Sequence, residues 1–133
     1  MAPTDARLLA DVLAGVRAGW PGGAWEWDGR FSCALAKVSG GEQASKAREM
    51  LTAQLPVIWS ADKLAEAPAS VRQVCARTGG LRGDQLVFSA ELADGALCYC
   101  LWWPWGSGRE ISARIGAAGG PPAVALRVAF GIP

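Results

Sequence analysis

Two apolar runs in the last third of the chain constrain the fold most. Residues 85–92 (QLVFSAEL) and 96–103 (ALCYCLWW) flank the dipeptide Asp94-Gly95. Asp-Gly between two apolar runs indicates a β-hairpin, because glycine readily adopts the positive φ that a tight turn requires. The sequence therefore predicts two antiparallel strands joined at this dipeptide, with at least one face in the core.

The register of this hairpin follows from the turn. With a two-residue turn, Ala93 faces Ala96, and counting outward then sorts the side chains onto two faces. One face is entirely apolar or aromatic and is expected in the core: Leu86, Phe88, Ala90, Leu92, Leu97, Tyr99, Leu101 and Trp103. The opposite face pairs Glu91 with Cys98, Ser89 with Cys100 and Val87 with Trp102. The sequence leaves open whether a helix covers that face.

Helical patterns fill much of the first half. Apolar residues at three-four spacing predict an amphipathic helix up to about residue 18. Ser39-Gly-Gly-Glu42 has the spacing of a capping box and predicts a second helix. Residues 69–77 (ASVRQVCAR) follow a proline and precede Gly79-Gly80, which predicts a third helix.

Two further strand regions complete the sheet. Asp28-Gly29 predicts a first hairpin in which Trp27 faces Arg30, so that the guanidinium can stack on the indole. Residues 109–116 (REISARIG) alternate between apolar and polar and predict another strand. Residues 124–132 alternate as well, which predicts a last strand, although an alanine-rich helix remains an alternative.

These elements predict an α+β fold in one domain, residues 1–133. An antiparallel β-sheet with helices packed on one face is expected, in the order α-ββ-α(α)-βββ-β. This order of elements is similar to that of small roadblock- or profilin-like scaffolds, a likeness in element order alone that assigns the chain to no family.

Composition excludes several functions. The chain has no histidine, which removes histidine-based acid–base catalysis, Ser-His-Asp and Cys-His nucleophiles, and histidine-containing metal sites. Thirteen basic against twelve acidic residues give a net charge of +1, so nucleic acid and anionic membranes are not expected partners. Asp5 and Asp11 interrupt the apolar N-terminal region, and no basic stretch precedes it. We therefore expect a cytoplasmic protein.

The four cysteines do not predict a metal or redox site. Cys98-x-Cys100 places two thiols on one face of a strand, whereas structural zinc sites use two Cys-x2–4-Cys pairs in turns. Cys33 and Cys75 are distant in the sequence and would have to be recruited separately. We expect buried free thiols, no metal and no cofactor.

The seven tryptophans carry the functional hypothesis. Tryptophan is enriched at binding hot spots, and this chain holds more of it than a core of this size requires. We expect a contact surface for a protein partner, which could be a second copy of the chain. Its predicted residues are Trp25, Trp27, Trp102, Trp105 and Arg109. An equally weighted alternative is that a helix covers these tryptophans and makes them core.

The sequence thus favours a non-catalytic protein-binding module, such as an adaptor, chaperone or immunity-type accessory protein of the small bacterial kind. The alternative is a protein that binds a small apolar or aromatic ligand in a cavity between sheet and helices. A third option is an enzyme that uses Glu91 or another carboxylate, which would need a second carboxylate converging in the same cleft.

Overall fold

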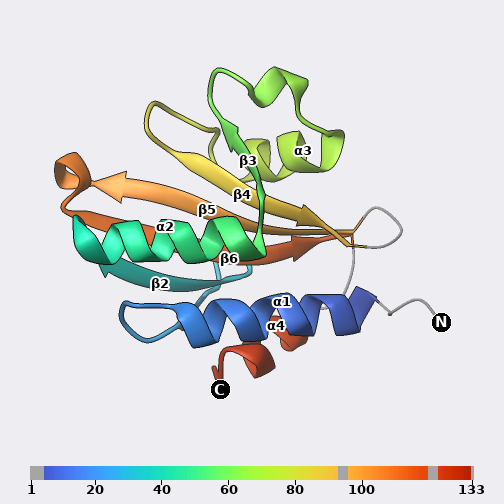
Figure 1. The fold of residues 1–133 in the computed structure, drawn as a ribbon. Coiled ribbons are helices and arrows are strands. Elements are labelled where there is room, and N and C mark those ends of the chain that lie inside the picture. The colour runs from blue at the N-terminus through green and yellow to red at the C-terminus, as the bar shows by residue number, and fades with distance from the viewer. Residues whose placement is uncertain (1–4, 93–95, 120–122, 133) are drawn as a thin grey trace.

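The computed structural model describes residues 5–92, 96–119 and 123–132. They form a six-stranded antiparallel sheet in the order β1-β2-β6-β5-β4-β3, with helices on both sides (Figure 1). The strands are β1 (Glu26–Asp28), β2 (Cys33–Ser39), β3 (Val57–Ser60), β4 (Leu86–Glu91), β5 (Leu97–Trp105) and β6 (Glu110–Ala118). The helices are α1 (Asp5–Gly19), α2 (Glu42–Gln54), α3 (Ala69–Arg77) and α4 (Ala123–Ala129), with 3-10 turns η1 (Leu64–Glu66) and η3 (Gly106–Gly108).

The predicted α+β class and antiparallel sheet are confirmed, and the predicted order of elements agrees broadly. None of the helices in the described ranges combines the length and the apolar character needed to cross a membrane.

Strand β5 lies between β6 and β4 and is buried on both faces. Every side chain from Leu97 to Trp103 is buried. Because side chains alternate along a strand, Cys98, Cys100 and Trp102 belong to one core cluster, and Tyr99 and its odd-numbered neighbours belong to the other. One strand therefore contributes to two separate cores.

We call the first side of the sheet the covered face. Its buried side chains are Ala34, Val38, Phe88, Cys98, Cys100, Trp102, Ile111, Ala113 and Ile115. Helices α1, α2 and α4 all lie on this side (Figure 1), and their apolar stripes complete its core cluster. The question that the sequence left open, whether the face with Cys98, Cys100 and Trp102 is exposed, is thereby answered: helices cover it.

We call the opposite side the mixed face. Helix α3 packs Val71, Val74 and Cys75 there against residues of β4 and β5 such as Val87 and Tyr99. The prediction placed helices on one face only, but α3 has an apolar stripe of its own that must be buried. Helix α3 does not cover the whole face. Over β2 and β6 the same side carries Lys37, Ser112 and Arg114.

The predicted register of the β4–β5 hairpin is wrong by one residue. Ala90 pairs with Cys98 and Glu91 with Leu97, and the N–H of Leu92 donates to the carbonyl of Ala96 over 2.8 Å. Three residues, 93–95, lie between Leu92 and Ala96 in the sequence. The prediction instead placed only two residues, Asp94 and Gly95, between the facing residues Ala93 and Ala96. The Asp94-Gly95 turn itself lies outside the described residues. The apolar pattern could not distinguish the two registers, because both faces of β5 are apolar and a shift of one residue would expose no apolar side chain of this strand.

The first hairpin also differs from its prediction. Asp28 pairs with Cys33, so four residues connect β1 and β2 and the predicted Trp27–Arg30 pairing is wrong. The Asp28 carboxylate accepts the backbone N–H groups of Arg30 (2.9 Å) and Phe31 (3.3 Å). This side-chain bonding builds a wider turn than glycine alone predicts. The Arg30 guanidinium lies instead over the Phe31 ring, 4.9 Å from its centre.

The last element is a helix, so the strand predicted for residues 124–132 is wrong and the stated alternative holds. Leu126 and Phe130 are both buried, and a spacing of four places them on one side of a helical turn as readily as on one side of a strand. The edge strand β3 (Val57–Ser60) was not predicted from the sequence.

The two-sided burial of β5 predicts very different costs for two nearby tryptophans. Trp102→Ala should lower the free energy of unfolding by about 3–5 kcal/mol, because it empties a core site in which the indole is 2% exposed. Trp105→Ala should change it by less than about 1 kcal/mol, since that ring is 51% exposed. Chemical denaturation of both variants measures the two values, and equal losses would contradict this account of β5.

Candidate functional site

Two adjoining hollows open on the mixed face beside the edge of α3. Their volumes are about 300 Å³ and about 310 Å³, and Trp105 and Arg114 line both. We call the pair the Trp105 groove. Its first hollow is lined by Arg30, Phe31, Thr78, Gly79, Gly80, Arg82, Gln85, Trp103, Trp105 and Arg114. Its second hollow is lined by Leu35, Lys37, Trp105, Glu110, Ser112 and Arg114.

Trp105 stands where β5 emerges from the core. Trp103, two residues earlier on the same face, is still buried, whereas Trp105 is 51% exposed. The indole Nε1 of Trp105 donates a hydrogen bond of 2.6 Å to the Ser112 hydroxyl on the neighbouring strand β6. The bond fixes the ring in one orientation while half of its surface stays accessible. A rigid, accessible aromatic side chain is the usual anchor of a binding surface.

Arg114 holds the floor of the groove together. Its Nε donates to Oδ2 of Asp28 over 2.9 Å, and its Nη1 donates to the Ser112 hydroxyl over 3.2 Å. The guanidinium also lies 4.4 Å from the centre of the Trp103 ring. Asp28 and Arg114 are 12% and 14% exposed, so water screens this ion pair little. Asp28 thereby connects the β1–β2 turn, through Oδ1, to strand β6, through Oδ2.

The pKa of Asp28 reports this environment. Burial alone would raise it, but hydrogen bonds from the Arg114 side chain and from the backbone N–H groups of Phe31 and Arg30 favour the charged form, as does the Arg114 charge. The net effect places the pKa of Asp28 below its ordinary value of 3.8. The carboxylate is therefore charged at neutral pH and committed to Arg114.

Helix α3 ends at the rim of the groove. Gly79 and Gly80 have φ values of 94° and 88°, a conformation that glycine adopts without strain, and Gly80 N–H donates to the Cys75 carbonyl over 2.7 Å. This cap turns the chain away from α3 towards Arg82. Arg77, in the last turn of α3, donates a hydrogen bond of 3.3 Å to the Tyr99 hydroxyl. This hydroxyl lies so close to the Gly116 backbone that a Cβ at position 116 would overlap it.

The charge of the groove is positive. Glu110 is engaged with Lys37 at 3.9 Å, and Asp28 is engaged with Arg114. Within the described ranges, no carboxylate lies at ion-pair distance from Arg30 or Arg82, and both are exposed. Phe31 packs edge-on against Trp103, with ring centres 5.9 Å apart. The groove thus offers ring faces and guanidinium donors, which suit an anionic or aromatic group of a ligand.

The five predicted contact residues do not form one surface. Trp102 is buried in the covered-face core, which rules it out as a contact residue because no partner can reach it. Trp25 and Trp27 pack on that same side, where the Arg127 guanidinium lies 4.7 Å from the centre of the Trp27 ring. Trp105 lies on the mixed face. Arg109 is exposed in the β5–β6 connection, outside the lining of either hollow.

Sequence reasoning missed the arginines and Phe31 of the groove. It placed Arg30 and Phe31 in a strand, because a two-residue turn at Asp28-Gly29 left no room for them in a loop. It treated Arg114 only as one of the polar residues of the alternating strand predicted at 109–116 and gave it no partner. Asp28 was the available signal, since aspartate bonds readily to the backbone two residues ahead and thereby favours a longer turn.

The four cysteines are buried free thiols. Burial raises the pKa of Cys33 and of Cys98 to about 12, and it also raises the pKa of Cys75 and Cys100 above the ordinary value. Among the residues that the structure describes, no group of three or more Cys, Asp or Glu could hold a metal ion.

Comparisons with models of known protein families, with curated proteins and with solved structures find no match.

Burial predicts that the thiols are unreactive in the folded state. The thiolate is the reactive form, and a pKa of about 12 leaves almost none at pH 8. An aromatic disulfide reagent should therefore label the native protein only at the rate of unfolding, and all four thiols promptly in denaturant. Rapid native labelling of even one cysteine would contradict the burial described above.

The Asp28–Arg114 pair predicts a pH-dependent stability. Asp28→Asn should lower the free energy of unfolding by roughly 2 kcal/mol at pH 7, because it removes a charge-assisted bond. A pKa that is lowered in the folded state contributes stability in full above the unfolded value and loses it as the pH falls through the folded value. The difference between wild type and variant should therefore shrink in acid below about pH 4.

Glu110→Gln is the matched control for this measurement. Its pair with Lys37 is more than half exposed, so its loss should cost less than about 0.5 kcal/mol. Denaturant unfolding at several pH values gives all three curves. An Asp28→Asn effect as small as that of Glu110→Gln would show that the pair does not hold the groove together.

Proposed function

We propose that the protein is a non-catalytic protein-binding module whose partner docks in the Trp105 groove. The observation that carries the proposal is Trp105 itself, half exposed, held by Ser112 and standing between two hollows. Tryptophan and arginine are the residue types that contribute most to protein interfaces, and this groove combines Trp105 with Arg30 and Arg82.

The surroundings of Trp105 suggest how a partner would bind. Asp28, Arg114 and Ser112 are bonded to one another, so the floor is preorganised and loses little side-chain freedom on association. Arg30 and Arg82 are exposed and lie at the rim, where charges mainly raise the association rate and select the partner. We expect the partner to present an apolar side chain to Trp105 and carboxylates to the arginines.

An adaptor, a chaperone or an immunity-type accessory protein acting in the cytoplasm would use such a surface. A second copy of the chain is one candidate partner, and the oligomeric state tests it directly. The alternative, a small ligand enclosed between sheet and helices, has less support, because side chains of β5 fill the space on both of its faces.

Affinity capture with three forms of the protein tests the proposal. A specific partner should be recovered with wild type and lost with Trp105→Ala, because the variant removes the accessible indole while leaving the core intact. Val128→Ala is the matched control, since Val128 is 74% exposed on α4, away from the groove. Wild type and Val128→Ala should recover the same partner in equal amounts.

The double variant Arg30→Gln with Arg82→Gln should weaken recovery most at low salt and make it less dependent on salt, because high salt already screens the exposed arginine charges of the wild type. Sedimentation of the wild type and Trp105→Ala shows whether the partner is the chain itself. Equal recovery by all forms, together with an unchanged oligomeric state, would overturn the proposal.

A further inference from the structure

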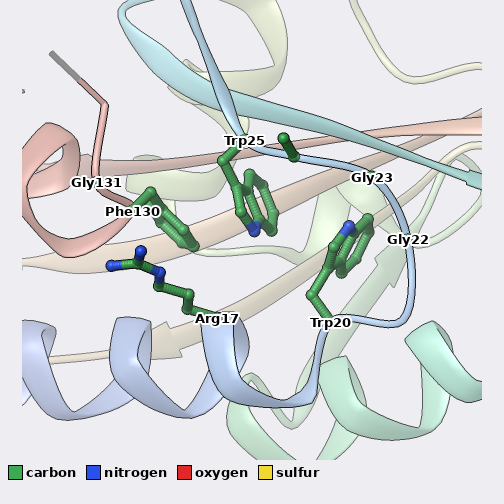
Figure 2. Close-up of a pocket in the computed structure, with 8 residues that line it drawn as sticks. Arg17, Trp20, Gly22, Gly23, Trp25, Phe130 and Gly131 are labelled. Atoms are coloured by element: carbon green, nitrogen blue, oxygen red, sulfur yellow. The ribbon is translucent and has the colours of Figure 1, made fainter.

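A third hollow lies on the helical side of the molecule. It is bounded by the end of α1, the segment between α1 and β1, and the residues that follow α4 (Figure 2), and its volume is about 430 Å³. Its lining consists of Arg17, Trp20, Gly22, Gly23, Ala24, Trp25, Phe130 and Gly131. The volume lies in the range of about 300–1,000 Å³ that is typical of small-molecule sites. The hollow shares no lining residue with the Trp105 groove.

Three aromatic rings form one wall of this hollow. The centre of the Trp25 ring lies 4.9 Å from that of Trp20 and 4.3 Å from that of Phe130, so the rings follow one another in a row (Figure 2). Both pairs are tilted, by 47° and 37°, and ring surface remains at the hollow because the indoles are only partly buried. A row of this kind suits a flat, apolar ligand body.

Arg17 supplies the charge of the hollow. Its Nη1 donates to the Ala129 carbonyl at the end of α4 over 3.1 Å, which ties α1 to α4. The guanidinium passes close to Gly131, whose φ is 65° and where a Cβ would lie 2.9 Å from Nη2. Glycine at this position therefore admits the guanidinium beside Phe130, as Figure 2 shows.

The charge balance decides which ligand fits. Aromatic rings by themselves would also suit an organic cation. The ends of α1 and α4 add partial negative charge nearby, but the last carbonyls of α4 already accept hydrogen bonds from Arg17 and from the backbone N–H groups of residues 130–132. The full charge of Arg17 outweighs them, and none of the described residues that line the hollow is acidic. An anion is therefore favoured over a cation.

The indole nitrogens are a second, independent feature. Among the described residues, the buried Nε1 atoms of Trp20 and Trp25 have no hydrogen-bond partner, as is also true of Trp59 and Trp103 elsewhere in the molecule. A buried donor without an acceptor is unfavourable, and a ligand oxygen reached by a small rotation of either ring would relieve it. Both features favour a ligand with oxygen acceptors.

We propose that this hollow binds a small aromatic carboxylate, with the ring against Trp20, Trp25 and Phe130 and the carboxylate on Arg17. The site is separate from the Trp105 groove, so it gives the protein a small-ligand function in addition to partner binding. Arginine suits this role because its planar group donates two parallel hydrogen bonds to a carboxylate.

Binding of three probes tests the proposal. Indole-3-acetate carries a ring and a carboxylate, indole-3-acetamide carries the same ring without charge, and tryptamine carries it with a positive charge. In titrations followed by NMR, indole-3-acetate should shift the Nε1–H signals of Trp20 and Trp25, and not that of Trp105. The amide should bind roughly tenfold more weakly, and tryptamine more weakly still.

Two arginine variants supply the controls. Arg17→Gln should lower the affinity for indole-3-acetate by roughly tenfold while leaving that for the amide unchanged. Arg82→Gln, in the other groove, should change neither affinity. Because Arg17 also bonds to Ala129, denaturation of Arg17→Gln checks its fold, and Arg17→Lys, which keeps the charge, should retain part of the affinity.

Four results would overturn the proposal. They are the absence of saturable binding by indole-3-acetate, equal affinity for the acid and either other probe, shifts centred on Trp105, and an unchanged acid affinity in Arg17→Gln. Loss of the protein partner in Trp105→Ala with intact probe binding would separate this site from the partner surface.

Discussion

The burial of β5 on both faces is the constraint on which the rest of the structure depends. Seven consecutive side chains, from Leu97 to Trp103, are shielded from water, and an isolated hairpin could shield at most one side of them. The strand therefore needs hydrogen-bonded neighbours on both edges, β4 and β6, and helices on both faces. Figure 1 shows the result, with α1, α2 and α4 on one side of the sheet and α3 on the other.

Unequal cover over the two faces creates the candidate binding surface. Three helices close the covered face, whereas α3 and η1 close only part of the mixed face. At the boundary the chain exposes Trp105 and fixes the surface around it with the Asp28–Arg114 ion pair. The same carboxylate shapes the β1–β2 turn that brings Arg30 and Phe31 to the groove. The hydrogen bonds of Asp28 thus stabilise both the β1–β2 turn and the floor of the Trp105 groove.

The sequence predicted the fold class because local patterns determine it. Alternation and turn signals predicted the β4–β5 hairpin and the strand β6. Apolar spacing predicted α1, the Ser39-Gly-Gly-Glu42 pattern predicted α2, and a flanking proline and glycines predicted α3. The capping box itself does not form, because Gly41 is the N-cap of α2 and no side chain bonds to it. Register was beyond those patterns, because Cys98 and Tyr99 are equally suited to a core and a slip of one residue exposes neither. The C-terminal helix was misassigned for a related reason, since Leu126 and Phe130 satisfy both periods.

The candidate sites were harder to predict than the fold, because they depend on long-range contacts. The predicted contact surface included Trp105, which is accessible, and Trp102, which is buried. The number of tryptophans in the sequence could not distinguish the two. Arg114 meets Asp28 across 86 positions of sequence, and Arg17 meets Ala129 across 112. Nothing local in the chain marks either pairing.

Oxidative footprinting of the β5 tryptophans tests the central claim most directly, that the strand passes from a two-sided core to an accessible surface at Trp105. No lysine or arginine occurs between Arg82 and Arg109, so one tryptic peptide carries Trp102, Trp103 and Trp105 together and serves as its own control. Brief exposure to hydroxyl radicals should oxidise Trp105 many times faster than the other two. Similar rates at all three tryptophans would contradict the account.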